Sequence, residues 1–131
     1  MKALTPAHRA FLESPFIAVV TVLRPDGSPH STPLWVDVDD EGVSVNTAWP
    51  RAKPRYLAAD PRVSLVVVDP NDELRWLGIS GTATLTEEGA NEQIDRLARK
   101  YRGHDRYMSH REGETRVSVR ISPTFVESRG L

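Results

Sequence analysis

The chain has 131 residues, 39% of them hydrophobic and 27% charged, which fits one soluble globular domain spanning residues 1–131. The net charge of −1 excludes a global attraction to nucleic acid, and the lack of cysteine excludes disulfides, thiolate nucleophiles and cysteine metal sites. No apolar run is long enough to span a bilayer and no signal-peptide pattern opens the chain. We therefore expect a cytoplasmic protein without a membrane or nucleic-acid partner.

Short strands and a few helices alternate along the chain. Thr5 and Pro6 form the N-cap and first position of a helix that is expected to end near Ser14. Apolar patterns then predict six strands, at 16–23, 30–38, 43–46, 63–68, 76–85 and 117–121. Two further helices are expected at 53–59 and 87–102. Pro33 lacks an N–H, which places the second strand at a sheet edge or a bulge.

Most of these strands are joined by turns of hairpin length, such as the Arg-Pro-Asp-Gly turn at 24–27. Short turns join antiparallel neighbours, because parallel strands need long crossover connections. We therefore predict a mainly β fold with inserted helices, in which about six antiparallel strands form a barrel.

A basic cluster is the most informative feature of the sequence. It consists of Arg51, Lys53 and Arg55. Pro54 is tolerated at the first helical position, so the helix is expected to begin near Lys53 with the cations at its N-terminus. The helix dipole already makes that end positive, which favours a bound phosphate or carboxylate there. The alternative is a solvated charged face paired with Asp60 or Asp26, and the residues alone leave both interpretations open.

A second candidate is the run His30, Ser31, Thr32 and Pro33. Pro33 interrupts strand pairing and frees backbone groups to meet a ligand, while the small hydroxyl side chains leave room for a flat ring. The alternative is an ordinary edge strand that uses proline against aggregation. Trp76 falls opposite the apolar register of its strand. It is expected to cover a planar cofactor, to pack at a subunit interface, or to lie half-buried against a helix.

The sequence shows no self-sufficient catalytic group. Its four histidines are scattered without metal-site spacing, and we expect no bound metal. There is neither a glycine-rich phosphate loop between strand and helix nor a nucleophile elbow. If the protein is an enzyme, a cofactor is therefore expected to carry the chemistry.

Several segments together resemble the pyridoxamine 5′-phosphate oxidase-like split barrels. Residues 24–35 (RPDGSPHSTPLW) resemble the first hairpin of that family. Residues 50–57 (PRAKPRYL) and 60–65 (DPRVSL) resemble its phosphate-binding helix and the following strand, and 81–85 (GTATL) resembles a later strand. The resemblance implies a split β-barrel. The residues of these motifs are most similar to those of the actinobacterial branch that uses the deazaflavin F420. Membership of that branch implies a homodimer with two cofactor sites between the subunits.

The resemblance also implies roles for individual residues. Carried over by position, the three residues of the basic cluster would hold the cofactor phosphate. The residues that would line the ring are His30, Ser31, Thr32, Pro33, Thr47 and Ala48. Trp76 would lie near the ring or the substrate. Pro54 departs from the family pattern, in which a small helix-former stands between the lysine and the arginine.

The function implied by the resemblance is an F420-dependent oxidoreductase, a reductase that transfers a hydride between the deazaflavin and a small electron-poor organic substrate. His30 or solvent would deliver the proton. One alternative is an FMN-binding oxidase or reductase of the pyridoxamine-phosphate-oxidase-like type. The other is a non-catalytic protein that binds a cofactor or another small molecule without turnover.

Overall fold

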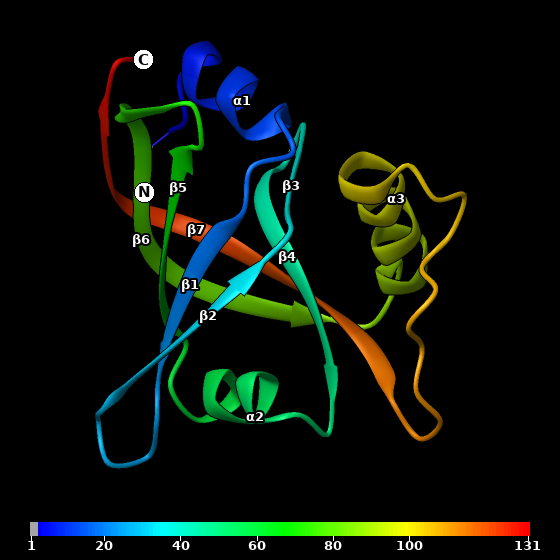
Figure 1. The fold of residues 1–131 in the computed structure, drawn as a ribbon. Coiled ribbons are helices and arrows are strands. Elements are labelled where there is room, and N and C mark those ends of the chain that lie inside the picture. The colour runs from blue at the N-terminus through cyan, green and yellow to red at the C-terminus, as the bar shows by residue number, and fades with distance from the viewer. Residues whose placement is uncertain (1–2) are drawn as a thin grey trace.

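The computed structural model describes residues 3–131, which form three helices and seven strands (Figure 1). Their order is α1 (Pro6–Glu13), β1 (Ala18–Leu23), β2 (Pro29–Leu34), β3 (Val36–Asp39), β4 (Gly42–Trp49), α2 (Ala52–Ala59), β5 (Arg62–Asp69), β6 (Asp72–Thr86), α3 (Ala90–Arg102) and β7 (Thr115–Arg129). Met1 and Lys2, on which the absence of a signal-peptide pattern partly rests, lie outside the described residues. Within the described range, no helix combines the length and the apolar character needed to cross a bilayer.

All seven strands belong to one antiparallel sheet in the order β2-β1-β5-β6-β7-β4-β3. The sheet curls around a core of aliphatic side chains, with α1 at one end and α2 at the other (Figure 1). β2 and β3 are its two edges. The predicted mainly β split barrel is therefore confirmed, and so is the edge position of the strand that contains Pro33.

The expected strand at 30–38 is divided at Trp35, which is why the sheet has seven strands instead of about six. β2 pairs with β1 at one edge, whereas β3 pairs with β4 at the other, so the chain crosses between the edges at this residue. The Trp35 ring stacks on Tyr101 with 5.5 Å between ring centroids. The Tyr101 hydroxyl accepts from the Val36 N–H at 3.0 Å and donates to the Phe16 carbonyl at 2.7 Å, replacing strand pairing at the crossing.

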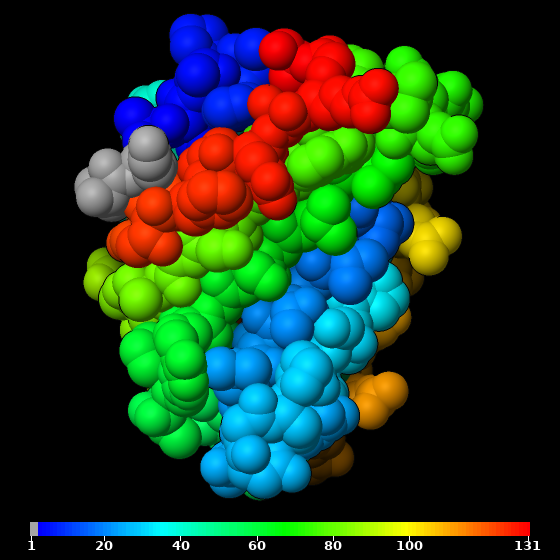
Figure 2. All heavy atoms as spheres, turned by 90° about the vertical axis from the view of Figure 1, so that its left-hand side faces the viewer, coloured from blue at the N-terminus to red at the C-terminus, as the bar shows by residue number. Residues whose placement is uncertain are grey.

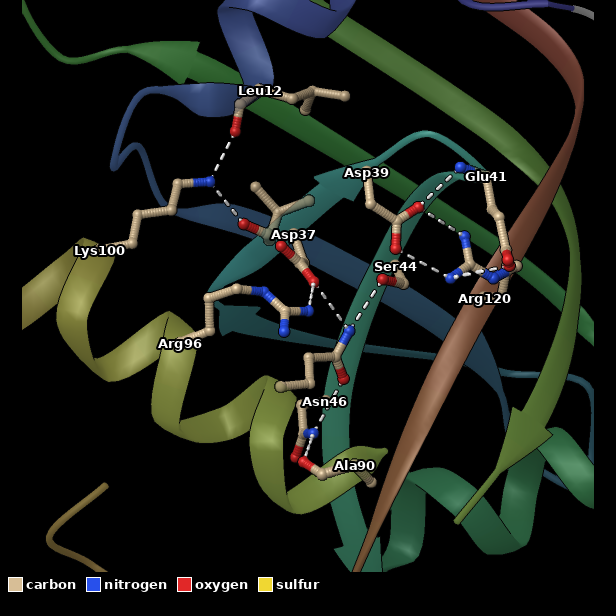
Figure 3. A network of polar contacts seen from close by, with 12 residues as sticks. Leu12, Asp37, Asp39, Glu41, Ser44, Asn46, Ala90, Arg96, Lys100 and Arg120 are labelled. Atoms are coloured by element: carbon tan, nitrogen blue, oxygen red, sulfur yellow. Dashed lines mark hydrogen bonds and ion pairs between the residues drawn. The ribbon is translucent and has the colours of Figure 1, made fainter. Parts of the chain in front are cut away.

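Helix α3 covers the outer face of β3 and β4 and joins them through polar side chains (Figure 3). Strand alternation turns Asp37 to this face, where it is only 6% exposed. Its carboxylate accepts hydrogen bonds from Gln93 at 3.2 Å and Arg96 at 2.7 Å. A buried carboxylate is tolerated because both partners are present.

The contribution of the contact between α3, α1 and β3 to the stability of the fold depends on pH. Lys100 Nζ donates to the Leu12 and Val36 carbonyls at 2.6 and 2.7 Å (Figure 3), and burial lowers the pKa of Lys100 to about 8. The unfolded lysine titrates near 10.5, so between these values the unfolded state binds more protons. The free energy of unfolding therefore rises with pH across this window, and the contribution of Lys100 is lost as the pH falls through about 8.

The matched variant Lys100→Met isolates this titration, because the other groups cancel in the comparison. We expect wild type to gain stability relative to Lys100→Met as the pH is raised from about 7 to about 9.5. Urea denaturation at the two pH values measures the change. A difference that stays constant with pH would mean that Lys100 keeps an ordinary pKa in the folded protein.

Candidate functional site

The basic cluster lies at the N-terminus of α2, which closes the end of the barrel opposite α1 (Figure 1). Arg51 is the N-cap and Ala52 the first helical residue, so the helix begins one residue before Lys53 and two residues before Pro54. Pro54 occupies the third helical position instead of the first. This position is still acceptable, because N–H groups of the first turn have no partner within the helix. The predicted gathering of cations at the helix start is confirmed.

Arg51 and Arg55, two of the three cations of the cluster, are not paired with the acidic residues expected from the sequence. Arg51 forms a bidentate ion pair with Glu114, the residue just before β7, including a hydrogen bond of 2.9 Å from Nη2 to Oε1. Neither expected partner is used, because Asp60 pairs with Arg62 and Asp26 accepts from Ser28 within its own turn. The ion pair raises the pKa of Arg51 and lowers that of Glu114. The third cation, Arg55, is exposed, and its Nε donates to the Arg51 carbonyl at 3.3 Å.

Lys53 is the unusual member of the cluster. The residue is 8% exposed, and within residues 3–131 its ammonium has neither a hydrogen-bond partner nor a carboxylate within 4.0 Å. Burial lowers its pKa, and the neighbouring charge of Arg51 lowers it further. Its Nζ atom is not fully buried, so the ammonium is only partly desolvated. An anion bound beside it would offset the cost of that desolvation.

Strand β2 presents two more unsatisfied groups to the same interior. His30 and Thr32 lie opposite Val22 and Val20, which belong to the core, so both point into the barrel. His30 Nδ1 and Thr32 Oγ1 are buried without a hydrogen-bond partner. The pKa of His30 is lowered by burial first and then by the charge of Lys53. The imidazole packs edge-on against Tyr56 of α2, with ring centroids 5.6 Å apart.

The remaining ring-lining candidates do not share one face. Thr47 lies opposite the core residue Val117 and faces inward. Ala48 lies opposite Arg116, on the face toward α3. Ser31 and Pro33 alternate with the inward residues of β2 and point outward. Ser31 shares a hydrogen bond of 2.8 Å with Thr21 Oγ1.

Trp76 is not brought to the basic cluster within one chain. It is half-buried and pairs with Val68 and Arg129, at the far end of the β5–β6 pair from α2. Its side chain belongs to the outer face of the sheet, as predicted, while the neighbouring Leu77 is fully buried. A role for Trp76 at the site of the same chain is therefore not supported by its position.

A cavity of about 660 Å³ lies beside the cluster, between α3, the end of β2 and the loop 103–114. Arg51 and Pro33 line it together with Tyr107 of that loop and with three residues that the sequence analysis did not single out: Trp35, Asn46 and Arg116. Arg116 follows the alternation of a final strand, in which a charged residue indicates a solvent-facing position. Only the packing of α3 and the loop over that face reveals its burial. No group of metal-ligating side chains occurs in the part of the chain that the structure describes.

Comparison with known proteins gives a consistent result. A family model described as pyridoxamine 5′-phosphate oxidase matches residues 4–129. An F420 reductase has a TM-score of 0.80 and 24% identity, over 95% of this chain and 98% of that one. A conserved hypothetical protein from Mycobacterium tuberculosis has a TM-score of 0.75 and 26% identity, over 97% and 85%. The heme storage protein of Vibrio cholerae has a TM-score of 0.69 and 15% identity, over 99% and 97%. At 24% and 15% identity, these likenesses support the fold alone.

Proposed function

The chain belongs to the pyridoxamine 5′-phosphate oxidase family, and from this membership we propose that it is an F420-dependent oxidoreductase acting on a small electron-poor organic substrate. The observation that carries the proposal is Lys53, a buried residue whose partly desolvated ammonium has no partner in residues 3–131. An anionic group of a bound cofactor would supply the missing counter-charge.

The residues around Lys53 fit a phosphate-bearing cofactor with a flat ring. Lys53 and the exposed Arg55 would hold the phosphate, with Arg51 fixed beside them by Glu114. The unsatisfied atoms of His30 and Thr32 would hydrogen-bond polar edges of the ring. When bound, reduced F420 supplies a hydride from its ring carbon, while the protein contributes binding, orientation and exclusion of water.

His30 is better suited to hold the ligand than to store a proton. Its pKa lies below its ordinary value, so the imidazole is mostly neutral at pH 7. A neutral imidazole still donates from one ring nitrogen and accepts at the other. We therefore propose that solvent supplies the proton of the reduction, with His30 orienting the ring.

FMN is the second candidate cofactor, and one observation favours it. Because Arg51 is already paired with Glu114, two cations of the cluster remain for the ligand. Two cations suffice for the single terminal phosphate of FMN. F420 carries a phosphodiester and a polyglutamate tail, which can use Lys53, the exposed Arg55 and further groups along an open groove.

We further propose a homodimer with the cofactor sites between the subunits. Figure 2 looks onto the outer face of the sheet, where β7, β6, β5, β1 and β2 follow one another. Large apolar side chains are exposed on this face by 37–54%, a feature typical of interaction surfaces. They are Ile17, Val19, Val66, Val68 and Phe125.

Turnover separates an enzyme from a carrier. Chemically reduced F420 is mixed anaerobically with menadione, a quinone, with and without the protein, and reoxidation is followed by the return of the deazaflavin absorbance. We expect faster reoxidation with wild type than with Lys53→Ala or without protein. If F420 binds but its reoxidation is not accelerated with menadione or with a panel of imines and activated alkenes, the carrier interpretation replaces the enzyme.

A further inference from the structure

The cavity beside the basic cluster has the size and walls of a small-molecule site. Its volume of about 660 Å³ suits a compact organic ligand. Trp35 and Tyr107 provide aromatic walls, and Ile94 and Leu97 of α3 provide apolar ones. The two aromatic rings contact each other edge-on, with 6.1 Å between centroids. A flat apolar body would find matching surfaces here.

The polar wall of this cavity is Arg116, the second residue of β7. It is 6% exposed, yet its Nε and Nη2 atoms have no hydrogen-bond partner. Glu114 Oε1 lies 3.8 Å from Nη2, which is too far for a hydrogen bond, and its carboxylate is held by Arg51. Buried N–H groups are rarely left unpaired, so two adjacent ones indicate a missing acceptor.

The guanidinium is held in place before any ligand arrives. It lies over the Tyr107 ring, 4.6 Å from its centroid, and Nη1 donates to Asn46 Oδ1 at 3.2 Å. The Asn46 amide nitrogen donates to the Ala90 carbonyl and to Gln93 Oε1, both at 2.9 Å, as the dashed lines in Figure 3 show. These two bonds fix the amide orientation, so that its oxygen must face Arg116.

Gln93 is fixed in turn by the strands beneath α3. Its Nε2 donates to Ser44 Oγ at 2.9 Å and to Asp37 Oδ2 at 3.2 Å, and Asp37 is held by Arg96. This chain of hydrogen bonds runs from the surface to the cavity and satisfies one nitrogen of Arg116. It leaves the side of the guanidinium formed by Nε and Nη2 preorganised for a ligand, which lowers the entropic cost of binding.

The charges around the cavity favour an anion. Three arginines line it, Arg51, Arg102 and Arg116, and none of the described residues that line it is acidic. Glu114 balances one of these charges through its ion pair with Arg51. A net positive, partly desolvated cavity attracts a carboxylate more strongly than its neutral analogue.

We propose that this cavity binds the substrate and selects organic carboxylates with a flat aromatic body. The two carboxylate oxygens accept from Nε and Nη2 of Arg116, which is the paired geometry that a guanidinium offers. The ring packs beside Trp35 and Tyr107. The assignment of this ligand as substrate rests on the proposed function, whereas the selectivity for carboxylates rests on the cavity alone.

The test compares two isosteric probes by calorimetric titration of the cofactor-free protein. We expect 2-naphthoate to bind about 10- to 100-fold more tightly than 2-naphthamide, because only the former presents an anion to the guanidinium. Arg116→Gln should abolish this preference. Arg120→Gln, a paired arginine on the same strand and face, should retain it. The wild-type comparison needs no variant and remains decisive if Arg116→Gln does not fold.

The outcomes separate this proposal from the cofactor assignment. Equal affinity for the two probes, or no binding of naphthoate, overturns the carboxylate site. F420 titration of Arg116→Gln is the second arm, and we expect an affinity within about threefold of wild type. If Arg116→Gln loses affinity for F420 and naphthoate to a similar extent, Arg116 binds the polyglutamate carboxylates of the cofactor. That result would overturn its assignment as a substrate-binding residue. A preference for naphthoate over naphthamide without any F420 binding would support the carboxylate site and contradict the assignment of F420 as cofactor.

Discussion

Gly81→Ala is expected to lower the free energy of unfolding by about 3 kcal/mol or more, or to prevent folding. A methyl group at this position would lie 2.0 Å from the Ser122 carbonyl oxygen and 2.8 Å from its carbon. The register between β6 and β7 shifts between Ser80 and Gly81, so the two backbones approach closely at this irregularity. Relief would require the backbone of the longest strand pair to move.

Gly78→Ala is the matched control, three residues earlier on the same strand. There a methyl group meets only side chains, the nearest being Glu127 Cγ at 3.4 Å, and that side chain is flexible. We expect a change within about 1 kcal/mol in urea denaturation. Similar losses for both variants would show that β6 does not tolerate alanine in general, and that the close approach to Ser122 is not the cause.

Lys53→Met is expected to weaken F420 binding by about 10- to 100-fold and to stabilise the cofactor-free protein. The affinity falls because the partly desolvated ammonium is the counter-charge of the proposed phosphate site. The stability rises because methionine fills a similar volume without a desolvated charge. Removing the unpaired cation should raise the melting temperature by roughly 3–6 °C, which corresponds to about 1–2 kcal/mol.

This opposition between stability and binding distinguishes a ligand site from a structural lysine. Arg62→Met, at a neighbouring cation that is exposed and paired with Asp60, should change neither quantity measurably. Fluorescence titration and thermal melting of the three proteins provide the comparison. Lower stability of Lys53→Met with unchanged affinity would mean that the lysine supports the fold and holds no anion.

Local patterns predicted much of the fold because each element satisfies its own rules. Thr5 caps α1 by accepting from the His8 N–H at 3.1 Å, as expected of a threonine before proline. The strict alternation of β6 is reproduced, with Leu77 and Ile79 buried and Thr82 and Thr84 exposed. The likeness to the pyridoxamine 5′-phosphate oxidase family is confirmed by a match over residues 4–129.

The predictions failed where contacts between residues far apart in the sequence determine the structure. The break at Trp35 depends on Tyr101, which lies 66 positions later and is brought there by α3. The ion pair between Arg51 and Glu114 joins residues 63 positions apart, and the local sequence around neither residue predicts it. Arg116 and Lys53 are similar cases, since their burial results from the packing of several segments that lie far apart in the sequence.

The most direct test of the account is a fluorescence titration of the cofactor-free protein with F420 and, separately, with FMN. We expect saturable F420 binding at micromolar concentration or below, and weaker binding of FMN. Tighter binding of FMN would keep the phosphate site at Lys53 and move the protein to the second candidate cofactor. If neither compound binds at micromolar concentration, the cofactor assignment is wrong, and the split-barrel fold is what remains.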